Sequence, residues 1–288
     1  GHIDHCIRES IKLGLKPIDA ISMASKNCFD YYNMSKDLGG IAPGKLADIL
    51  IFDDLQSKPT KVFVGGKLVV SNGSIVTSIK KKTISSWIKK TVKLKKLSPK
   101  DFSIISKKQS ILANTIFMQS EIITKLSSVE LLTKEGNVLT SLDKDVWKVA
   151  ALDRIHGTNN YTIGFLENFG ADIGAFASTW SFHENDMIVI GSNDLDMSIA
   201  ANSLIKNQGG LVVVKSGKII ASLPLQLAGI ISTDSFEKVL SNFEQINNSI
   251  VDSGCKFSRP SLIPLFLPFI ALPSIRILSG GIVDVKTR

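Results

Sequence analysis

Residues 41–73 read IAPGKLADILIFDDLQSKPTKVFVGGKLVVSNG and alternate turn signals with short apolar runs. A Pro-Gly pair comes first, and the apolar run Ile49–Phe52 ends at two aspartates. Val62–Val64 and Leu68–Val70 are separated by Gly65-Gly66, a spacing that predicts a β-hairpin with a two-residue turn. This segment therefore predicts a small sheet of short strands.

The order of these signals resembles the closing segment of the amidohydrolase superfamily, in which a PG-x-x-AD turn leads into such a hairpin. The resemblance implies that residues 1–40 are the last helices of a metal-bearing barrel and that residues 41–76 belong to a small β-sheet domain beside it. We expect the strands that complete this sheet in the family to be missing. Either Ile49–Phe52 or Val62–Val64 would then present an unpaired edge.

The helices of the first 40 residues are predicted from spacing and caps. Apolar residues recur with helical period over Ile3–Leu15. Pro17 suits the first position of a second helix that ends near Ser25, and Asn27 is placed to cap a third short helix.

Composition indicates a globular protein of one or two domains. The chain has 288 residues, of which 44% are hydrophobic and 21% charged. The longest apolar stretch, Leu262–Leu272, contains two prolines and is shorter than the ~20 residues that span a bilayer. The opening GHIDHC lacks the features of a signal peptide. We therefore expect no membrane association and a cytoplasmic location.

Three cysteines give neither a disulfide framework nor a cysteine-based zinc motif, and they suit a reducing compartment. Cys28 and Cys255 are expected to be small buried hydrophobic residues.

The net charge of +8 is concentrated in one segment. Eleven lysines and a single acid, Asp101, lie between residues 80 and 108. We interpret residues 77–118 as a Lys-rich connector, either a solvated linker or a surface helix. Binding to nucleic acid is the alternative, but only Trp87 and Phe102 could stack on bases, so a nucleic-acid partner is not expected.

The second half, residues 119–288, is predicted to be an α+β domain, because its strands and helices mix without the regular alternation of a doubly wound sheet. Helices are expected from about Leu195 to Lys206 and after a Ser235 cap. The predicted strands, including one hairpin around Ser216-Gly217, are Val146–Leu152, Ile163–Phe165, Ala175–Thr179, Met187–Ile190, Leu211–Val214, Lys218–Ala221 and Ile282–Val285.

A string of motifs in this half resembles the C-terminal domain of the prokaryotic adenine deaminases. The family's H-D-S-H-N segment corresponds to Phe182–Asp186, FHEND. The opening GHIDH and the later GLKP also resemble that family, which extends the likeness to nearly the whole chain except the connector. The other motifs are Asp153–Thr158, Gly164-Phe165, Phe169-Gly170, Met187–Asp194, Asp196-Met197, Gly209–Val214, Leu223–Leu225, Ala228-Gly229, Phe269 and Leu272-Pro273.

The resemblance implies a chemistry for the complete enzyme, of which this chain would be the C-terminal portion. Adenine and water would give hypoxanthine and ammonia on a divalent metal pair, of manganese or iron. A metal pair lowers the pKa of bound water to around 7 and so supplies the nucleophile. The metal ligands would lie on the missing N-terminal barrel half, so we expect no metal ligand in this chain and doubtful activity for the chain alone.

The candidate site residues fall into three groups. His156 with Asp153 would form a catalytic dyad, with a structural histidine as the alternative. His183 lies in a loop before a buried strand, a common place for site residues. His2, Asp4 and His5 would lie on the substrate side or orient other groups, with helix capping and simple exposure as the alternative.

Two other functions stay open at this point. The chain could be a catalytically inactive fragment or the partner-binding half of a split enzyme, and a homo-oligomer is also compatible with the sequence. The third reading is a nucleic-acid-binding protein acting through the Lys-rich connector.

Overall fold

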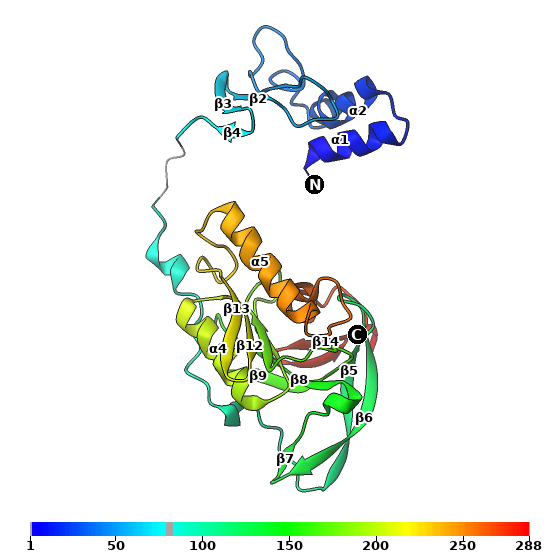
Figure 1. Cartoon of the computed structure of the whole chain (residues 1–288), viewed down its shortest axis with the longest axis vertical. Coiled ribbons are helices and arrows are strands. Elements are labelled where there is room, and N and C mark those ends of the chain that lie inside the picture. The colour runs from blue at the N-terminus through cyan, green and yellow to red at the C-terminus, as the bar shows by residue number, and fades with distance from the viewer. Residues whose placement is uncertain (1, 79–82, 288) are drawn as a thin grey trace. The chain divides into compact units, whose positions relative to one another are not determined.

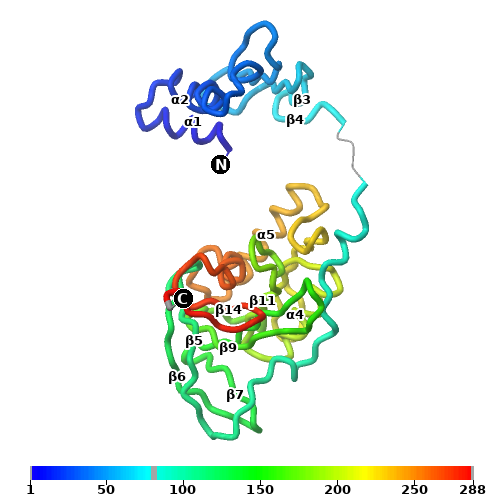
Figure 2. The backbone as a smooth tube through the Cα atoms, turned by 180° about the vertical axis from the view of Figure 1, so that it is seen from behind, coloured from blue at the N-terminus to red at the C-terminus, as the bar shows by residue number. Residues whose placement is uncertain are grey.

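The chain divides into two compact units in the computed structural model, which describes residues 2–78 and 83–287. The first unit is Gly1–Thr83 and the second is Ile84–Arg288 (Figures 1 and 2). Helices and several sheets occur together, which agrees with the mixed α and β content predicted from the sequence. Each unit is described by itself below.

The first unit opens with three helices, α1 (Ile3–Lys12), α2 (Pro17–Ala24) and α3 (Lys26–Tyr31). Pro17 takes the first helical position of α2, as predicted. The expected cap of α3 is wrong, because Ser25 rather than Asn27 precedes the helix. Ser25 breaks the helical run with φ −136° and ψ −89°, so Asn27 lies inside the last of these helices.

The sheet of the first unit has the order β1-β2-β3-β4. Gly65 and Gly66 join β2 to β3 with φ values of 54° and 76°, which glycine adopts without steric cost. The predicted hairpin is therefore confirmed. β1 is an edge strand, whereas β2 lies between two partners, so Val62–Val64 does not form a free edge. The strands are β1 (Ile49–Ile51), β2 (Lys61–Val64), β3 (Lys67–Ser71) and β4 (Ser74–Ile75).

The first unit leaves most of its apolar side chains uncovered. Within residues 2–78, Ala20 is the only buried residue. A cavity of about 480 Å³ opens between the helices and β1, and its walls are mostly apolar. A folded unit normally buries such a surface. The first unit therefore does not complete a hydrophobic core from its own described residues. The apolar residues lining the cavity include Ile7, Ile21, Phe29, Leu46, Ile49 and Phe52.

The second unit is built on a nine-stranded sheet of order β13-β12-β10-β11-β8-β9-β5-β6-β7. Its neighbours pair antiparallel except β5 and β9, which are parallel. The strands are β5 (Ser110–Met118), β6 (Thr124–Lys134), β7 (Asn137–Val138), β8 (Val146–Leu152), β9 (Tyr161–Glu167), β10 (Ala175–Ser178), β11 (Met187–Gly191), β12 (Gly210–Lys215) and β13 (Lys218–Pro224). A separate hairpin joins β14 (Ile275–Leu278) to β15 (Gly281–Asp284).

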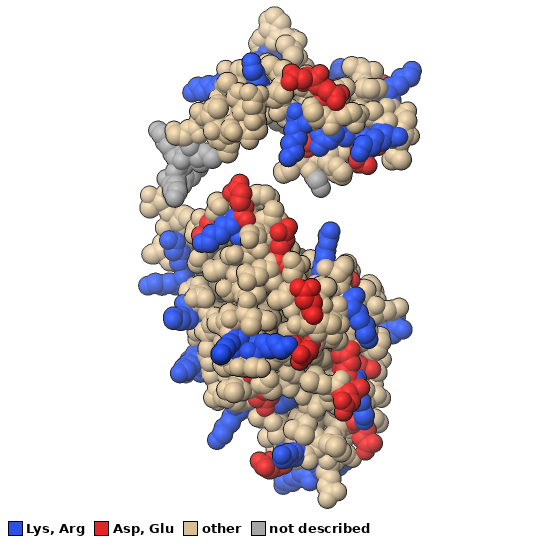
Figure 3. Space-filling model, viewed as in Figure 1, with Lys and Arg blue, Asp and Glu red and all other residues tan. Residues whose placement is uncertain are grey.

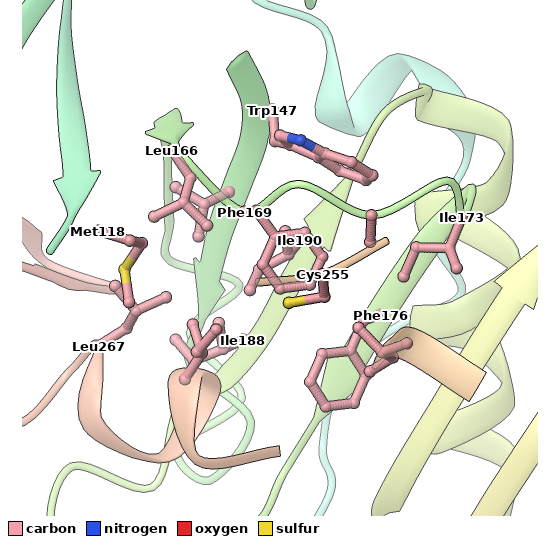
Figure 4. Close-up of a cluster of buried hydrophobic side chains, with 14 of the residues drawn as sticks. Met118, Trp147, Leu166, Phe169, Ile173, Phe176, Ile188, Ile190, Cys255 and Leu267 are labelled. Carbon is pink, nitrogen blue, oxygen red and sulfur yellow. The ribbon is translucent and has the colours of Figure 1, made fainter. Parts of the chain in front are cut away.

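Two helices cover opposite faces of this sheet (Figure 1). Alternate strand residues point to opposite faces. Phe176 and Ile188 therefore pack with α5 (Phe236–Val251), while the next residues along each strand pack with α4 (Asp194–Asn207). Figure 4 shows part of the core on the α5 side, where Trp147 and Phe169 meet edge to face at 5.1 Å. Both faces of the sheet centre are thus buried.

Most sequence-predicted elements of this unit are confirmed. β8 has the predicted bounds, and the other predicted strands differ by a few residues at their ends. Asn193 and Ser235 cap α4 and α5, each accepting a hydrogen bond from a backbone N–H of the first turn. The sequence reading missed β5, β6, β7 and β14, together with the short helix α6 (Ile263–Phe266).

The Lys-rich segment is not a free linker over its whole predicted length. Its last residues form β5, inside the large sheet. Upstream of β5, Val92 and Leu94 are buried against the α4 side of the sheet. Figure 3 shows lysine and arginine side chains projecting from the left side of this unit, where Figure 1 shows the segment. The second unit begins at Ile84 and so includes the rest of this segment, in which Lys93 faces solvent between the buried Val92 and Leu94.

Two amide side chains clamp this segment to the unit. Gln208 accepts a hydrogen bond from the Val92 N–H at 3.1 Å and donates one to the Val92 carbonyl at 3.2 Å. Asn202 pairs in the same two-way manner with the Leu97 backbone, at 2.9 and 2.7 Å. These side-chain hydrogen bonds take the place of the backbone hydrogen bonds that an extended segment would otherwise make with a neighbouring strand.

The cysteines follow the prediction in part. Cys255 is buried as expected, but Cys28 is exposed, because α3 belongs to the poorly covered first unit. In the described residues, no helix is both long and apolar enough to cross a membrane.

The free edge of β1 predicts self-association of the isolated chain. Leu50 lies in this edge strand and is 51% exposed, and exposed apolar edges pair with other chains. We expect the mass measured by light scattering to rise with protein concentration and Leu50→Lys to suppress that rise. Leu112→Lys is the control, since Leu112 is 75% exposed but its strand β5 lies inside the large sheet, between β9 and β6. A constant monomer mass for the unmodified chain would contradict this expectation.

Candidate active site

Three loops meet at one end of the large sheet because of its antiparallel register. Leu152 at the end of β8 lies opposite Met187 at the start of β11. The same end holds Ser178 of β10 and the Gly210–Pro224 pair of β12 and β13. The loops 153–160, 179–186 and 224–231 therefore leave the sheet side by side. The predicted residues Asp153, His156 and His183 all belong to these loops.

Asp153 is the centre of the first loop. Its carboxylate accepts hydrogen bonds from the hydroxyl of Thr158 at 2.6 Å and from the backbone N–H groups of Ile155 and His156, both at 3.1 Å. Burial alone would raise the pKa of this carboxyl, but the donors, led by Thr158, outweigh burial and hold the pKa at about 2. Asp153 is therefore an anion at neutral pH.

His156 is held by that anion. Its Nδ1 lies 3.0 Å from Asp153 Oδ1, and its side chain is 74% exposed. An ionised carboxylate only accepts hydrogen bonds, so Nδ1 carries the proton and Nε2 of the neutral ring is left as an acceptor. The predicted dyad is present as a contact, and its geometry suits a group that takes up and returns a proton at Nε2.

His183 lies in the second loop and has a different setting. Its Nδ1 is 2.7 Å from Glu184 Oε1, and its ring meets Phe269 edge to face at 5.7 Å. The imidazole is half exposed. A carboxylate thus orients each of the two histidines, one from the neighbouring residue and one from three residues upstream.

Arg154 in the first loop and Asp186 in the second are both buried. Burial lowers the pKa of Arg154 to about 10, and the Asp186 carboxylate opposes this effect. Burial raises the pKa of Asp186, although the Ser279 N–H donates a hydrogen bond to it at 2.7 Å. The first and second loops therefore each place an ionisable side chain inside the protein, among its apolar residues.

The remaining predicted residues belong to the first unit. His2 precedes α1 without a side-chain capping bond, and His5 is exposed on that helix. Asp4 pairs with Arg8 at 2.7 Å, and that hydrogen bond lowers the pKa of Asp4. Asp4 and Arg8 both line the mostly apolar cavity of the first unit, together with the polar residues Ser25 and Asp48.

The described residues do not offer a metal-ligand set. In residues 2–78 and 83–287, no three side chains of the histidine, cysteine, aspartate and glutamate types lie together as ligands. His156 and His183 each have one carboxylate neighbour, whereas protein zinc sites use three or four ligands. We therefore derive no chemical step through a metal from the residues of this chain.

Sequence reasoning missed several residues that build the site. Thr158, Arg154, Asp186 and Asn185 were quoted within motifs but received no role. Arg154 bonds to groups 25 to 74 residues away, and Ser279 reaches Asp186 from 93 residues away. The glycine-containing motifs Gly209-Gly210 and Ala228-Gly229 were the signal that a close backbone approach occurs here.

Comparison with known proteins defines the class of each part. The model of the amidohydrolase family matches residues 3–75, and the model of the adenine deaminase C-terminal domain matches residues 121–288. The second match covers more than half of the chain. The chain belongs to the family of proteins that carry the adenine deaminase C-terminal domain.

Curated relatives extend this likeness over the whole chain. An adenine deaminase of Cenarchaeum symbiosum is 54% identical over 100% of this chain and 48% of its own length. Adenine deaminases of Clostridium botulinum strain Langeland and Kosmotoga olearia are 35% and 34% identical over 99% of this chain. The chain spans about half the length of these relatives and corresponds to their C-terminal portion.

The lowered pKa of Asp153 predicts a pH-dependent contribution to stability. A carboxyl with a pKa of about 2 in the folded chain and 3.8 as its ordinary value stabilises the fold by about 2 kcal/mol above the ordinary value and loses this as pH falls towards 2. We expect Asp153→Asn to lower the free energy of unfolding by up to that amount at pH 7. The difference between the two proteins should vanish near pH 2.

Urea unfolding followed by tryptophan fluorescence measures this effect, because all three tryptophans, Trp87, Trp147 and Trp180, lie in the second unit. Asp172→Asn is the control, since the Asp172 side chain is 82% exposed. An equal loss for Asp153→Asn at pH 7 and pH 2 would show that the ionised carboxylate is not the stabilising form.

Proposed function

We propose that the complete protein is a metal-dependent adenine deaminase, which converts adenine and water to hypoxanthine and ammonia, and that this chain supplies its C-terminal portion. The observation that carries the proposal is the alignment of the whole chain with proteins named adenine deaminase, at 54% identity in one case. The polar loops of the second unit support it, because they present two oriented histidines at the end of a rigid sheet.

The first unit has the features of one part of a larger domain. We propose that residues 1–40 are the last helices of an amidohydrolase barrel and that residues 41–76 are part of its small sheet domain. The amidohydrolase match over residues 3–75 and the nearly coreless burial of this unit support the assignment. In the complete protein, the part that corresponds to the N-terminal half of the relatives would then cover the apolar cavity.

We propose a proton-transfer role for the loop histidines. Deamination must deliver a proton to the purine ring or to the leaving amine, and a positioned imidazole is suited to both tasks. Asp153 holds His156 in the tautomer whose Nε2 accepts a proton. The half-exposed His183 would act beside it at the substrate, while His2, Asp4 and His5 would contribute polarity from the barrel side.

We propose that the N-terminal half of the complete protein binds the divalent metal pair, of manganese or iron. When bound, such a pair activates water as the nucleophile. A cytoplasmic location is part of the proposal and is supported by three free cysteines. Nucleic acid is not proposed as a partner, since Phe102 is 1% exposed and leaves Trp87 as the exposed aromatic residue of the Lys-rich segment.

The chain without its N-terminal half is expected not to deaminate adenine. His156 and His183 are each paired with a single carboxylate, and the described residues contain no ligand cluster. The measurement is ammonia release from adenine by the purified chain with added manganese, iron or zinc, against a metal-only blank. The full-length Cenarchaeum relative serves as the positive control. Release above the blank would show that this chain holds a complete site.

Adding back a separately produced N-terminal half distinguishes the rival readings. Restored ammonia release would identify the chain as one half of a split enzyme. A complex without activity would favour an inactive, partner-binding chain.

In the complete protein, His156→Ala should lower kcat by about 10²-fold, the low end of the range for a proton-transfer group. His183→Ala should lower kcat less, because its segment departs from the family's H-D-S-H-N pattern. Melting temperature should barely move in either variant, since the two side chains are 74% and 53% exposed. Steady-state deamination and thermal melting measure both effects.

Lys218→Ala is a matched control for these variants, because Lys218 is exposed at the opposite end of the sheet. Full activity of His156→Ala, or activity lost only through unfolding, would show that His156 is structural.

A further inference from the structure

Arg154 connects the three loops of the candidate site through one buried guanidinium group. The residue is 0% exposed. Its Nη1 donates to the carbonyl of Ala228 at 3.0 Å, and its Nη2 lies 3.4 Å from Asn185 Oδ1 and 3.5 Å from the carbonyl of Thr179. Since Arg154 itself belongs to the first loop, these contacts join it to the other two.

The surrounding backbone is shaped to admit this side chain. Gly229 has a φ of 73°, and a Cβ at that position would lie 2.6 Å from Arg154 Nη1. Thr179 closes the other side, because its hydroxyl donates to the Gly229 carbonyl at 2.6 Å and accepts from the Gly210 N–H at 2.8 Å. Gly229 is therefore required by the space that the guanidinium fills.

A short chain of contacts leads from the Arg154 guanidinium to His183, and the Arg154 backbone belongs to the loop that carries His156. On one side Asn185, which contacts the guanidinium, donates through Nδ2 to the His183 carbonyl at 3.0 Å. On the other side Arg154 stands between Asp153 and His156 in the sequence, and its own carbonyl accepts a bond from the Lys93 N–H at 2.7 Å. Moving the guanidinium would therefore act on the His183 loop through Asn185 and on the His156 loop through the Arg154 backbone.

Simple anchoring of a buried cation does not require this arrangement, as Arg276 shows. Arg276 is also 0% exposed, and burial lowers its pKa to about 10 as well. Its guanidinium donates to the carbonyls of Leu272, Phe266, Ile122 and Pro273, all outside the three loops. The two arginines are thus alike in burial and charge but differ in what they connect.

We infer that Arg154 is a positioning residue that sets the His183–Glu184 pair relative to the Asp153–His156 dyad. Its effect on turnover rests on the proposed function, whereas its effect on loop geometry does not. The planar guanidinium donates to several acceptors at fixed angles, which a lysine ammonium cannot reproduce.

The geometric part is tested in the 288-residue chain with Arg154→Lys. The chain has four histidines, so their ring C–H signals are separable by NMR. His2 and His5 lie in the first unit and serve as internal references. We expect the His183 and His156 signals to shift and amide exchange over residues 179–186 to quicken about tenfold or more, from the loss of hydrogen bonds to a charged group. Arg276→Lys should leave these readouts unchanged.

The catalytic part is tested in the complete protein, well below the melting temperature of each variant. Arg154→Lys should lower kcat about tenfold or more, while Arg276→Lys should lower the melting temperature comparably but keep kcat. Shifted histidine signals with an unchanged kcat would overturn the proposed function of the loops and leave the positioning role intact. Unshifted signals and unchanged exchange in Arg154→Lys would overturn the positioning role itself.

A second variant keeps the test decisive if Arg154→Lys does not fold. Gly229→Ala pushes on the same guanidinium from outside, because the added Cβ meets Nη1 at 2.6 Å. The same His183 shift and faster exchange over residues 179–186 are expected. Gly73→Ala is its control, because Gly73 has a comparable φ of 77° but open space around the added Cβ. A folded Gly229→Ala chain with unshifted loop signals would also overturn the inference.

Discussion

The large sheet is buried on both faces at its centre, and this constraint decides where polar chemistry is possible. All seven residues of β8 are buried, with α5 covering one face and α4 the other. The one charged residue of β8, Lys148, is neutralised by Asp194 at the first position of α4, at 2.6 Å. An unpaired charge would be costly there. Ionisable groups free to act must therefore lie beyond the strand ends, where Asp153 and Asp186 follow and precede buried strands.

The two units solve the problem of apolar surface differently. In the second unit, α4 and α5 cover the two faces of the sheet and bury a hydrophobic core on each side. The first unit buries one residue among those described and leaves an apolar cavity open. Hydrophobic burial is the main favourable term in folding, so the first unit gains little of it from its own residues. This difference agrees with a chain that spans about half of its relatives' length.

How much the sequence predicts depends on the distance between the partners along the chain. β8 and the hairpin at Gly65-Gly66 were predicted because their signals are local: a mostly apolar run, interrupted only by Lys148, and a two-glycine turn. β6 was missed because polar residues occur on both of its faces, so apolar and polar residues do not alternate along it as they do in a half-buried strand. The clamps on Val92 and Leu97 join residues more than 100 positions apart, and no local pattern carries that information.

The same rule separates the predicted part of the site from the part that was missed. Asp153 and His156 are three residues apart, so a turn suffices to bring them together, and the dyad was predicted. Arg154 lies between them, yet its partners come from two other loops. No local pattern reveals its role, and the one trace of it elsewhere in the sequence is Gly229, where a Cβ would lie 2.6 Å from the Arg154 Nη1. The Ala228-Gly229 motif, which carries part of the family resemblance, therefore leaves the space that a buried arginine from another loop fills.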